Sequence, residues 1–221
     1  MSIKNELKEV YNTISQEFSS SRVFPWEELQ FFISYLKDNF NILDLGCGNG
    51  RLIKILEENN CKIEYIGIDF STELIKQAQE SFPQYTFKVK DMNNIDYEEN
   101  SFNMVFMIAS FHHLETKEER LELLKKINKW LKPGGYLFMT NWNLFQKKYF
   151  KFFFKNIIKK KAWNDFFIPW QTYSQEGERL WRFYHSFTKR ELENLLKKTN
   201  FKLKPHGVYK TEFNINSFVQ K

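Results

Sequence analysis

The stretch Ile42-Leu43-Asp44-Leu45-Gly46-Cys47-Gly48-Asn49-Gly50 decides the fold of this chain. The apolar residues of 41–45 predict a β-strand, and residues 50–59 have the spacing of an amphipathic helix. Three glycines stand between these elements, and glycine allows backbone turns and a close ligand approach that a Cβ would block. We therefore expect a ligand-binding loop at the N-terminus of a helix, as in proteins that bind nucleotides.

Two acidic residues indicate which ligand this loop favours. Asp44 lies two residues before the first glycine, and Asp69 ends the next expected strand, 63–69. The glycines follow the pattern G-x-G-x-G, whereas dinucleotide binders have G-x-G-x-x-G. Asp44 would repel a pyrophosphate and attract a cationic amino-acid group, and Asp69 can accept hydrogen bonds from both ribose hydroxyls. The pair favours a positively charged sulfonium cofactor over NAD.

The candidate cofactor-binding residues extend to the ends of the following strands. Asp91 and Met92 follow a third expected strand, 85–90, and are expected to meet an adenine ring, with Asp91 accepting from its exocyclic amine. The alternatives are a turn residue for Asp91 and a helix cap for Asp69. Cys47 is expected to pack, since no His or Asp is spaced to make it a nucleophile. The complete set is Asp44, Gly46, Cys47, Gly48, Gly50, Asp69, Phe70, Asp91, Met92 and Ala109.

Outside the loop, strands alternate with helices. Apolar runs predict further strands over 102–109 and 136–140, and T-K-E-E at 116–119 has the spacing of a capping box that opens a helix. This alternation implies right-handed crossovers and a mostly parallel sheet. Residues 201–210 and 212–220 are expected to close the sheet as a strand pair. The predicted class is α/β with a Rossmann-like fold.

Helices are also expected near both ends of the chain. Apolar residues spaced by three or four predict an amphipathic helix over 3–18, and a second helix is expected to start near Pro25. T-K-R-E at 188–191 is a second capping box, followed by a helix to Thr199.

Composition is consistent with one soluble domain. The chain has 221 residues, a formal net charge of +6 and two cysteines, which fit a reducing compartment and no disulfide framework. No apolar run approaches the ~20 residues that span a bilayer, and no signal peptide is evident at the start, so a cytoplasmic protein is expected. The expected parts are N-terminal helices (1–39), a cofactor-binding core (40–142), an inserted cap (143–187) and a closing helix and strand pair (188–221).

The segment 143–187 interrupts the alternation. It contains nine Lys or Arg, three acidic residues and fifteen aromatic residues, so its formal charge equals that of the whole chain. Such a segment is too apolar to be disordered. We interpret it as a basic, aromatic cap beside the active site.

The chain resembles the class I S-adenosylmethionine-dependent methyltransferases over residues 40–140 and 188–221. The resemblance implies a seven-stranded sheet whose last strand is antiparallel, with S-adenosylmethionine as the cofactor. Three substrate-side segments are similar to the eukaryotic tRNA wobble-uridine methyltransferases that esterify 5-carboxymethyluridine. They are residues 11–22 with Pro25-Trp26, residues 110–116 (Ser-Phe-His-His-Leu-Glu-Thr), and residues 182–187 (Arg-Phe-Tyr-His-Ser-Phe).

This closer resemblance implies roles for acceptor-side residues. A carboxylate acceptor needs a cation to hold it, and Arg22 and Arg182 are the candidates. His113 is expected to orient the acceptor, and His185 or Tyr184 to contact the base or ribose. The catalytic candidates are thus Arg22, His113, Arg182 and His185, and the substrate-binding candidates are Trp26, Trp142 and Tyr184. The alternatives, in which these residues do not contact a substrate, are surface ion pairs for the arginines, hydrogen-bonded structural roles for the histidines and core packing for Trp142. No metal site is expected.

The resemblance also implies partners, and other functions stay open. The family acts on tRNA together with a small zinc-binding activator subunit, whereas the Lys/Phe-rich stretch 147–161 is not typical of it. One alternative is a small-molecule methyltransferase for a carboxylate or hydroxyl acceptor. Another is a cofactor-binding module that docks on a membrane or a protein partner through 147–161, although the apolar positions there spread around a helix without forming one stripe.

Overall fold

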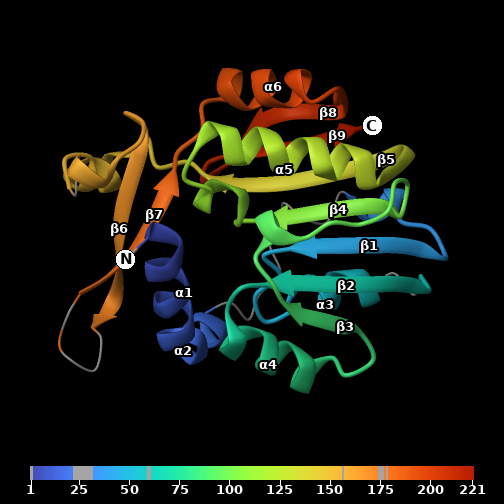
Figure 1. Cartoon of the computed structure of the whole chain (residues 1–221), viewed down its shortest axis with the longest axis horizontal. Helices are drawn as coiled ribbons and strands as arrows, with labels where there is room; N and C mark the ends of the chain where they lie inside the picture. The colour runs from blue at the N-terminus through green and yellow to red at the C-terminus, as the bar shows by residue number, and fades with distance from the viewer. Residues whose placement is uncertain (1, 22–31, 59–60, 156, 174–176, 178) are drawn as a thin grey trace.

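The computed structural model describes residues 2–21, 32–58, 61–155, 157–173, 177 and 179–221. Its centre is a seven-stranded sheet in the order β3-β2-β1-β4-β5-β9-β8, whose strands follow one another from bottom to top in Figure 1. The strands are β1 (Phe40–Leu45), β2 (Ile63–Asp69), β3 (Thr86–Val89), β4 (Phe102–Ile108), β5 (Leu131–Trp142), β8 (Lys202–Lys210) and β9 (Asn214–Gln220). β1 to β5 pair in parallel, while β9 runs antiparallel to both β5 and β8. The predicted class and the antiparallel last strand are confirmed.

Helices cover both faces of this sheet, as continuous apolar strands require. α5 (Lys117–Trp130) and α6 (Lys189–Lys198) pack in one buried cluster with residues such as Leu124 and Leu195. α3 (Leu52–Glu57) and α4 (Thr72–Ser81) contribute to the other, with residues such as Ile53 and Ile75. The Thr116 capping box that opens α5 is present in full.

Several boundaries differ from those expected. β5 begins at Leu131 because Leu131 pairs with Phe102. α3 starts later than residue 50, since Gly50 has a positive φ of 78° and cannot begin a helix. The expected helix over 3–18 is two helices, α1 (Ile3–Thr13) and α2 (Ser15–Ser20), because Ile14 between them leaves helical geometry with ψ near 5°. The helix expected near Pro25 lies outside the described residues.

The segment 143–187 forms a separate antiparallel ribbon of β6 (Asp165–Tyr173) and β7 (Arg179–His185). It is preceded by the 3-10 helices η4 (Lys147–Phe152) and η5 (Ile157–Lys159). Two further 3-10 helices, η2 (Met92–Asn94) and η3 (Phe111–His113), follow β3 and β4. Figure 1 shows the ribbon beyond the main sheet, alongside α1. Phe183 of β7 and Leu7 of α1 belong to one buried cluster, so the ribbon and the N-terminal helix support each other.

The sheet order places the site. β1 lies between β2 and β4, and chain order reverses there, which is where open α/β sheets bind ligands at the carboxyl ends of their strands. In the described part of the chain, no helix is both long and apolar enough to cross a bilayer.

Candidate active site

The glycine loop closes against the neighbouring strands. Its backbone is held by Gly46 N–H and Cys47 N–H, which donate to the carbonyl of Ile68 at 2.7 and 3.0 Å. Gly46 has φ +79°, and a Cβ there would lie 2.3 Å from the Cβ of Ser110. Only glycine therefore permits this turn and this approach of the loop to the segment after β4.

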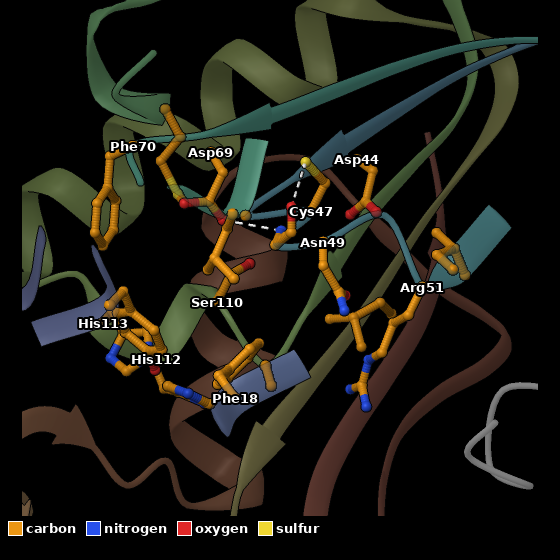
Figure 2. A pocket seen from close by; sticks show the side chains of 18 of the residues that line it. Phe18, Asp44, Cys47, Asn49, Arg51, Asp69, Phe70, Ser110, His112 and His113 are labelled. Carbon is orange, nitrogen blue, oxygen red and sulfur yellow. Dashed lines mark hydrogen bonds between the residues drawn. The ribbon is translucent and has the colours of Figure 1, made fainter. Parts of the chain in front are cut away.

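A cavity of about 810 Å³, counting the space open to solvent, lies over the loop. Figure 2 shows Asp44 of β1 and Asp69 of β2 on one side, and His112 and His113 of η3 on another. Eight predicted cofactor-binding residues line it: Asp44, Gly46, Cys47, Gly48, Asp69, Phe70, Met92 and Ala109. Three predicted acceptor-side residues, His113, Trp142 and Tyr184, line the same cavity. The two sets thus meet in one place.

Two predicted cofactor-binding residues do not line this cavity. Gly50 turns toward the rings of Phe82 and Phe87, so its role is to shape the loop. Asp91 lies in an adjoining smaller pocket, where its Oδ2 pairs with Lys4 Nζ at 2.6 Å. The two pockets share Phe70 and Met92, so an adenine contact from Asp91 stays a prediction.

Asp69 holds the loop as well as facing the cavity. Its Oδ2 accepts from Gly48 N–H at 2.9 Å and its Oδ1 from Ser71 N–H at 2.8 Å. Burial raises the pKa of Asp69, and these backbone donors oppose the shift. A carboxylate has about four lone-pair sites, so capacity remains for ligand hydroxyls. Ser71, and not Asp69, caps α4.

Asp44 is buried with half of its hydrogen-bonding capacity unused. The Tyr65 hydroxyl donates to Oδ2 at 2.7 Å, whereas the buried Oδ1 has no hydrogen-bond partner among the described residues. Burial raises the pKa of Asp44 to about 7, the Tyr65 hydrogen bond lowers it, and the nearby Asp69 adds to the rise. A cationic ligand group would relieve this burial of charge.

His113 is oriented from both ring nitrogens. Nδ1 lies 2.7 Å from the carbonyl oxygen of Phe183, and Nε2 lies 2.9 Å from the Tyr11 hydroxyl. Because a carbonyl only accepts, Nδ1 carries the proton, and Nε2 accepts from Tyr11. Tyr11 and Phe18 of the N-terminal helices also line the cavity. Sequence reasoning missed both, and their place in the family-like segment 11–22 was the one available signal.

Arg182 is a buried cation among rings. Its guanidinium carbon lies 4.6, 5.3 and 5.5 Å from the ring centroids of Trp170, Tyr184 and Trp142. Trp142 and Tyr184 stack at 5.1 Å with an interplanar angle of 12°. The side chain is 3% exposed, and its Nε and Nη1 lack hydrogen-bond partners among the described residues. Arg182 and Tyr184 share one face of β7, as residues two apart in a strand do.

Neither Arg182 nor His185 is among the residues that line the cavity, but Arg182 lies over the rings of two that do, Trp142 and Tyr184, whereas His185 lies elsewhere. Its Nδ1 lies 2.7 Å from Asp165 Oδ1, and its Nε2 lies 2.7 Å from Glu191 Oε1. It is buried and does not line the cavity, because it follows Tyr184 directly and projects from the opposite face of β7. This geometry fits the structural alternative, a hydrogen-bonded residue between the ribbon and α6, and a contact of His185 with the acceptor stays a prediction. The predicted site residues Arg22 and Trp26 lie outside the described residues.

Comparison with known proteins gives consistent matches. A family model described as "Methyltransferase domain" matches residues 16–206. The chain is 30% identical over 161 residues to a tRNA (carboxymethyluridine(34)-5-O)-methyltransferase of Saccharomyces cerevisiae, covering 73% of this chain and 54% of that protein. A Schizosaccharomyces pombe protein of the same name is 26% identical, with 90% of each chain covered. The predicted resemblance to these proteins is confirmed.

Structural matches agree on the fold. A SAM-dependent methyltransferase from Methanosarcina mazei has a TM-score of 0.73 and 25% identity, covering 86% of this chain and 96% of that chain. A Haloferax volcanii putative methyltransferase, solved in complex with the Trm112 methyltransferase activator, has a TM-score of 0.54 and 18% identity, covering 61% of this chain and 60% of that chain. The chain spans 33%, 54% and 21% of the length of the first three curated relatives it matches.

Proposed function

The chain belongs to the methyltransferase domain family, and from that premise we propose that it transfers a methyl group from S-adenosylmethionine to the carboxylate of a modified wobble uridine in tRNA. The names of its curated relatives support this acceptor. The arrangement of the cavity supports both halves of the reaction.

The cofactor half is supported by the two acids at the ends of β1 and β2. Asp44 offers an unpaired, buried carboxylate oxygen to a cationic amino-acid group, and Asp69 offers its free lone pairs to ribose hydroxyls. A Cβ on Gly48 would meet only the Phe18 ring, at 3.6 Å, so the backbone there is open to the cavity. These residues fit S-adenosylmethionine, and they disfavour a pyrophosphate.

The acceptor half is carried by one observation, the buried Arg182. A guanidinium without an acidic partner is costly to bury, so it favours an anionic ligand. In the described part of the chain Arg182 forms no ion pair, and two of its nitrogens are unused. A carboxylate can engage a guanidinium through two parallel hydrogen bonds. The stacked Trp142 and Tyr184 beside it offer ring faces to a nucleobase.

Catalysis in this site rests on positioning. S-adenosylmethionine, when bound, supplies an electrophilic methyl group. A carboxylate acceptor is already ionised near neutral pH, so no side chain has to remove a proton. Arg182 holds and orients the carboxylate, and the surrounding rings exclude water. His113, with both nitrogens engaged, positions the acceptor and does not act as a base.

The direct test uses tRNA whose wobble esters have been hydrolysed to free carboxylates. Incubation with the protein and isotope-labelled S-adenosylmethionine, followed by mass spectrometry of the nucleosides, should give labelled 5-methoxycarbonylmethyluridine. Arg182→Lys keeps the charge but loses the planar fork, so it should lower kcat/KM by about tenfold or more. The exposed Arg190→Lys serves as the matched control and should behave as wild type. Equal turnover by the two variants would contradict the proposed role of Arg182 in holding the acceptor carboxylate.

A small activator subunit is the partner we propose for this chain. The support is the fold shared with a methyltransferase solved together with such an activator. Adding a purified activator to the same assay should raise the yield of labelled ester. If small free carboxylates are methylated as well as tRNA, the small-molecule alternative takes the place of the tRNA reaction.

A further inference from the structure

A surface formed by residues 147–155 and 157–161 with Trp163 and Phe213, called here the Lys/Phe surface, has two different sides. On its inner side Tyr149, Phe152 and Phe153 pack into the buried cluster around Phe166. That cluster also contains Trp142 and Tyr184 of the acceptor site. The inner side therefore anchors the segment against the acceptor site.

The outer side exposes large apolar side chains. The exposed fractions are 58% for Phe150, 76% for Phe154, 65% for Trp163 and 51% for Phe213. Ile157 and Ile158 are exposed at 62% and 97%. In Figure 1 the segment lies on the outer side of β6, away from the main sheet. A group of exposed rings of this size marks an interaction surface.

The same segment carries positive charge, most of which forms no ion pair among the described residues. Residues 147–161 contain seven lysines and no acid. Lys159 pairs with Glu6, and the half-buried Lys160 lies over the rings of Phe153 and Phe166. Among the described residues no ion pair forms at the five exposed lysines Lys147, Lys148, Lys151, Lys155 and Lys161.

We infer that the Lys/Phe surface binds single-stranded RNA next to the acceptor site, with lysines on phosphates and the exposed rings stacked on unpaired bases. The inference rests on the proposed function, which identifies the methyl acceptor as a tRNA. Interleaved cations and rings are what unpaired RNA requires. A second copy of this chain fits poorly, since two such faces would bring ten unpaired lysines together. A lipid surface would depend on Ile157 and Ile158 as much as on the rings.

Four variants separate these occupants. The charge variant replaces Lys147, Lys148, Lys151, Lys155 and Lys161 by Gln. The ring variant, Phe150→Leu with Phe154→Leu, keeps apolar side chains but removes the stacking faces. The aliphatic variant is Ile157→Ser with Ile158→Ser. The control variant replaces five exposed lysines of α5, α6 and β8 by Gln: Lys125, Lys129, Lys197, Lys198 and Lys204. Circular dichroism and the thermal shift with S-adenosylhomocysteine check that each variant is folded.

Fluorescence anisotropy with an unmodified anticodon stem-loop, without cofactor, is the measurement. Wild type should bind the stem-loop more tightly than a fully paired duplex of equal length. The charge variant should reduce the slope of log affinity against log salt by up to about 3.5, since each of five phosphate contacts on a single strand contributes about 0.7. The ring variant should lose roughly tenfold in affinity for each base released. The aliphatic and control variants should bind as wild type.

Two results would overturn the inference. One is equal stem-loop binding by the charge and control variants. The other is a ring variant that binds RNA normally while the aliphatic variant loses binding to vesicles of mixed neutral and anionic phospholipid, which would assign the surface to a membrane. Methylation of free 5-carboxymethyluridine tests the proposed function separately. The charge variant should retain this methylation, and its absence from wild type would remove the proposed acceptor without affecting the stem-loop result.

Discussion

Asp44 lies at the carboxyl end of β1, with one carboxylate oxygen bonded to the Tyr65 hydroxyl and the other without a partner among the described residues. Its pKa, raised by burial from 3.8 to about 7, is a property of the folded protein alone. Ionising this carboxyl in the folded state costs free energy that a bound cation would offset. At the scale of single residues, the site is therefore arranged for a positively charged ligand.

The raised pKa predicts how stability depends on pH. Between pH about 4 and about 7 the folded protein holds a proton that the unfolded chain releases, so the free energy of unfolding falls as pH rises through this window. Asp44→Asn removes this loss, because its amide oxygen can still accept from Tyr65. The variant should exceed wild type in stability by up to about 4 kcal/mol above pH ~8, and by much less near pH ~4. Urea unfolding at several pH values measures the difference.

Tyr65→Phe provides the control for this prediction. The Tyr65 hydrogen bond lowers the pKa of Asp44, so its removal should move the stability change to higher pH. Identical pH profiles for wild type and Asp44→Asn would show that Asp44 is already ionised in the folded protein.

At the scale of elements, β7 distributes its residues between two tasks. Tyr184 lines the cavity and Arg182 lies over its ring, whereas Phe183 packs with α1 and His185 turns toward α6. Glu191 at the start of α6 was expected to complete a capping box with Thr188. Thr188 does cap the helix, but the Glu191 carboxylate instead meets His185 and the amide of Asn164. This hydrogen-bonded group joins the ribbon to the core.

His185→Ala should destabilise the protein without affecting the cofactor site. The change leaves Asp165 Oδ1 buried without its hydrogen bond to His185, and an unsatisfied buried polar atom costs about 1–3 kcal/mol. Chemical denaturation gives the loss, and calorimetry on the folded variant should give unchanged affinity for S-adenosylhomocysteine. The double change His185→Gln with Asp165→Asn should recover part of the stability. A His185→Ala variant with normal stability but low turnover would show that His185 acts on the acceptor and not on the fold.

At the scale of the molecule, the cavity is enclosed by parts that are distant in sequence. The glycine loop, η3, the ribbon and α1 all contribute to it (Figures 1 and 2). Tyr11 connects α1 to η3 through His113, and Lys4 connects it to Asp91. A ligand in the cavity should therefore stabilise the whole fold.

S-adenosylhomocysteine at about 100 times its Kd should add about 2.7 kcal/mol of stability, a rise in Tm of roughly 5–10 °C for a chain of this size. NAD at the same concentration should give no rise, because its pyrophosphate would face Asp44 and Asp69. Differential scanning calorimetry compares the two ligands. A shift with NAD comparable to that with S-adenosylhomocysteine would contradict the role of the two acids.

Local features of the sequence were sufficient for the cofactor half of the site. Glycines that need positive φ, and acids at the ends of apolar strands, are signals confined to a few neighbouring residues. The order of strands and helices then placed Asp44 and Asp69 together at the carboxyl ends of the parallel strands. Periodicity also predicted the closing strand pair, because each element shows its own buried face.

The acceptor half depended on tertiary structure. Tyr184 and His185 are neighbours in a family-like segment, yet alternation along β7 sends one to the cavity and the other to α6. Tyr11 reaches the site through a hydrogen bond to a residue 102 positions away. Arg182 is significant because its surroundings are rings and not acids. Which side chains are buried, which are hydrogen-bonded and which face of β7 lies toward the cavity depend on contacts between distant parts of the chain. These contacts exist only once the chain has folded.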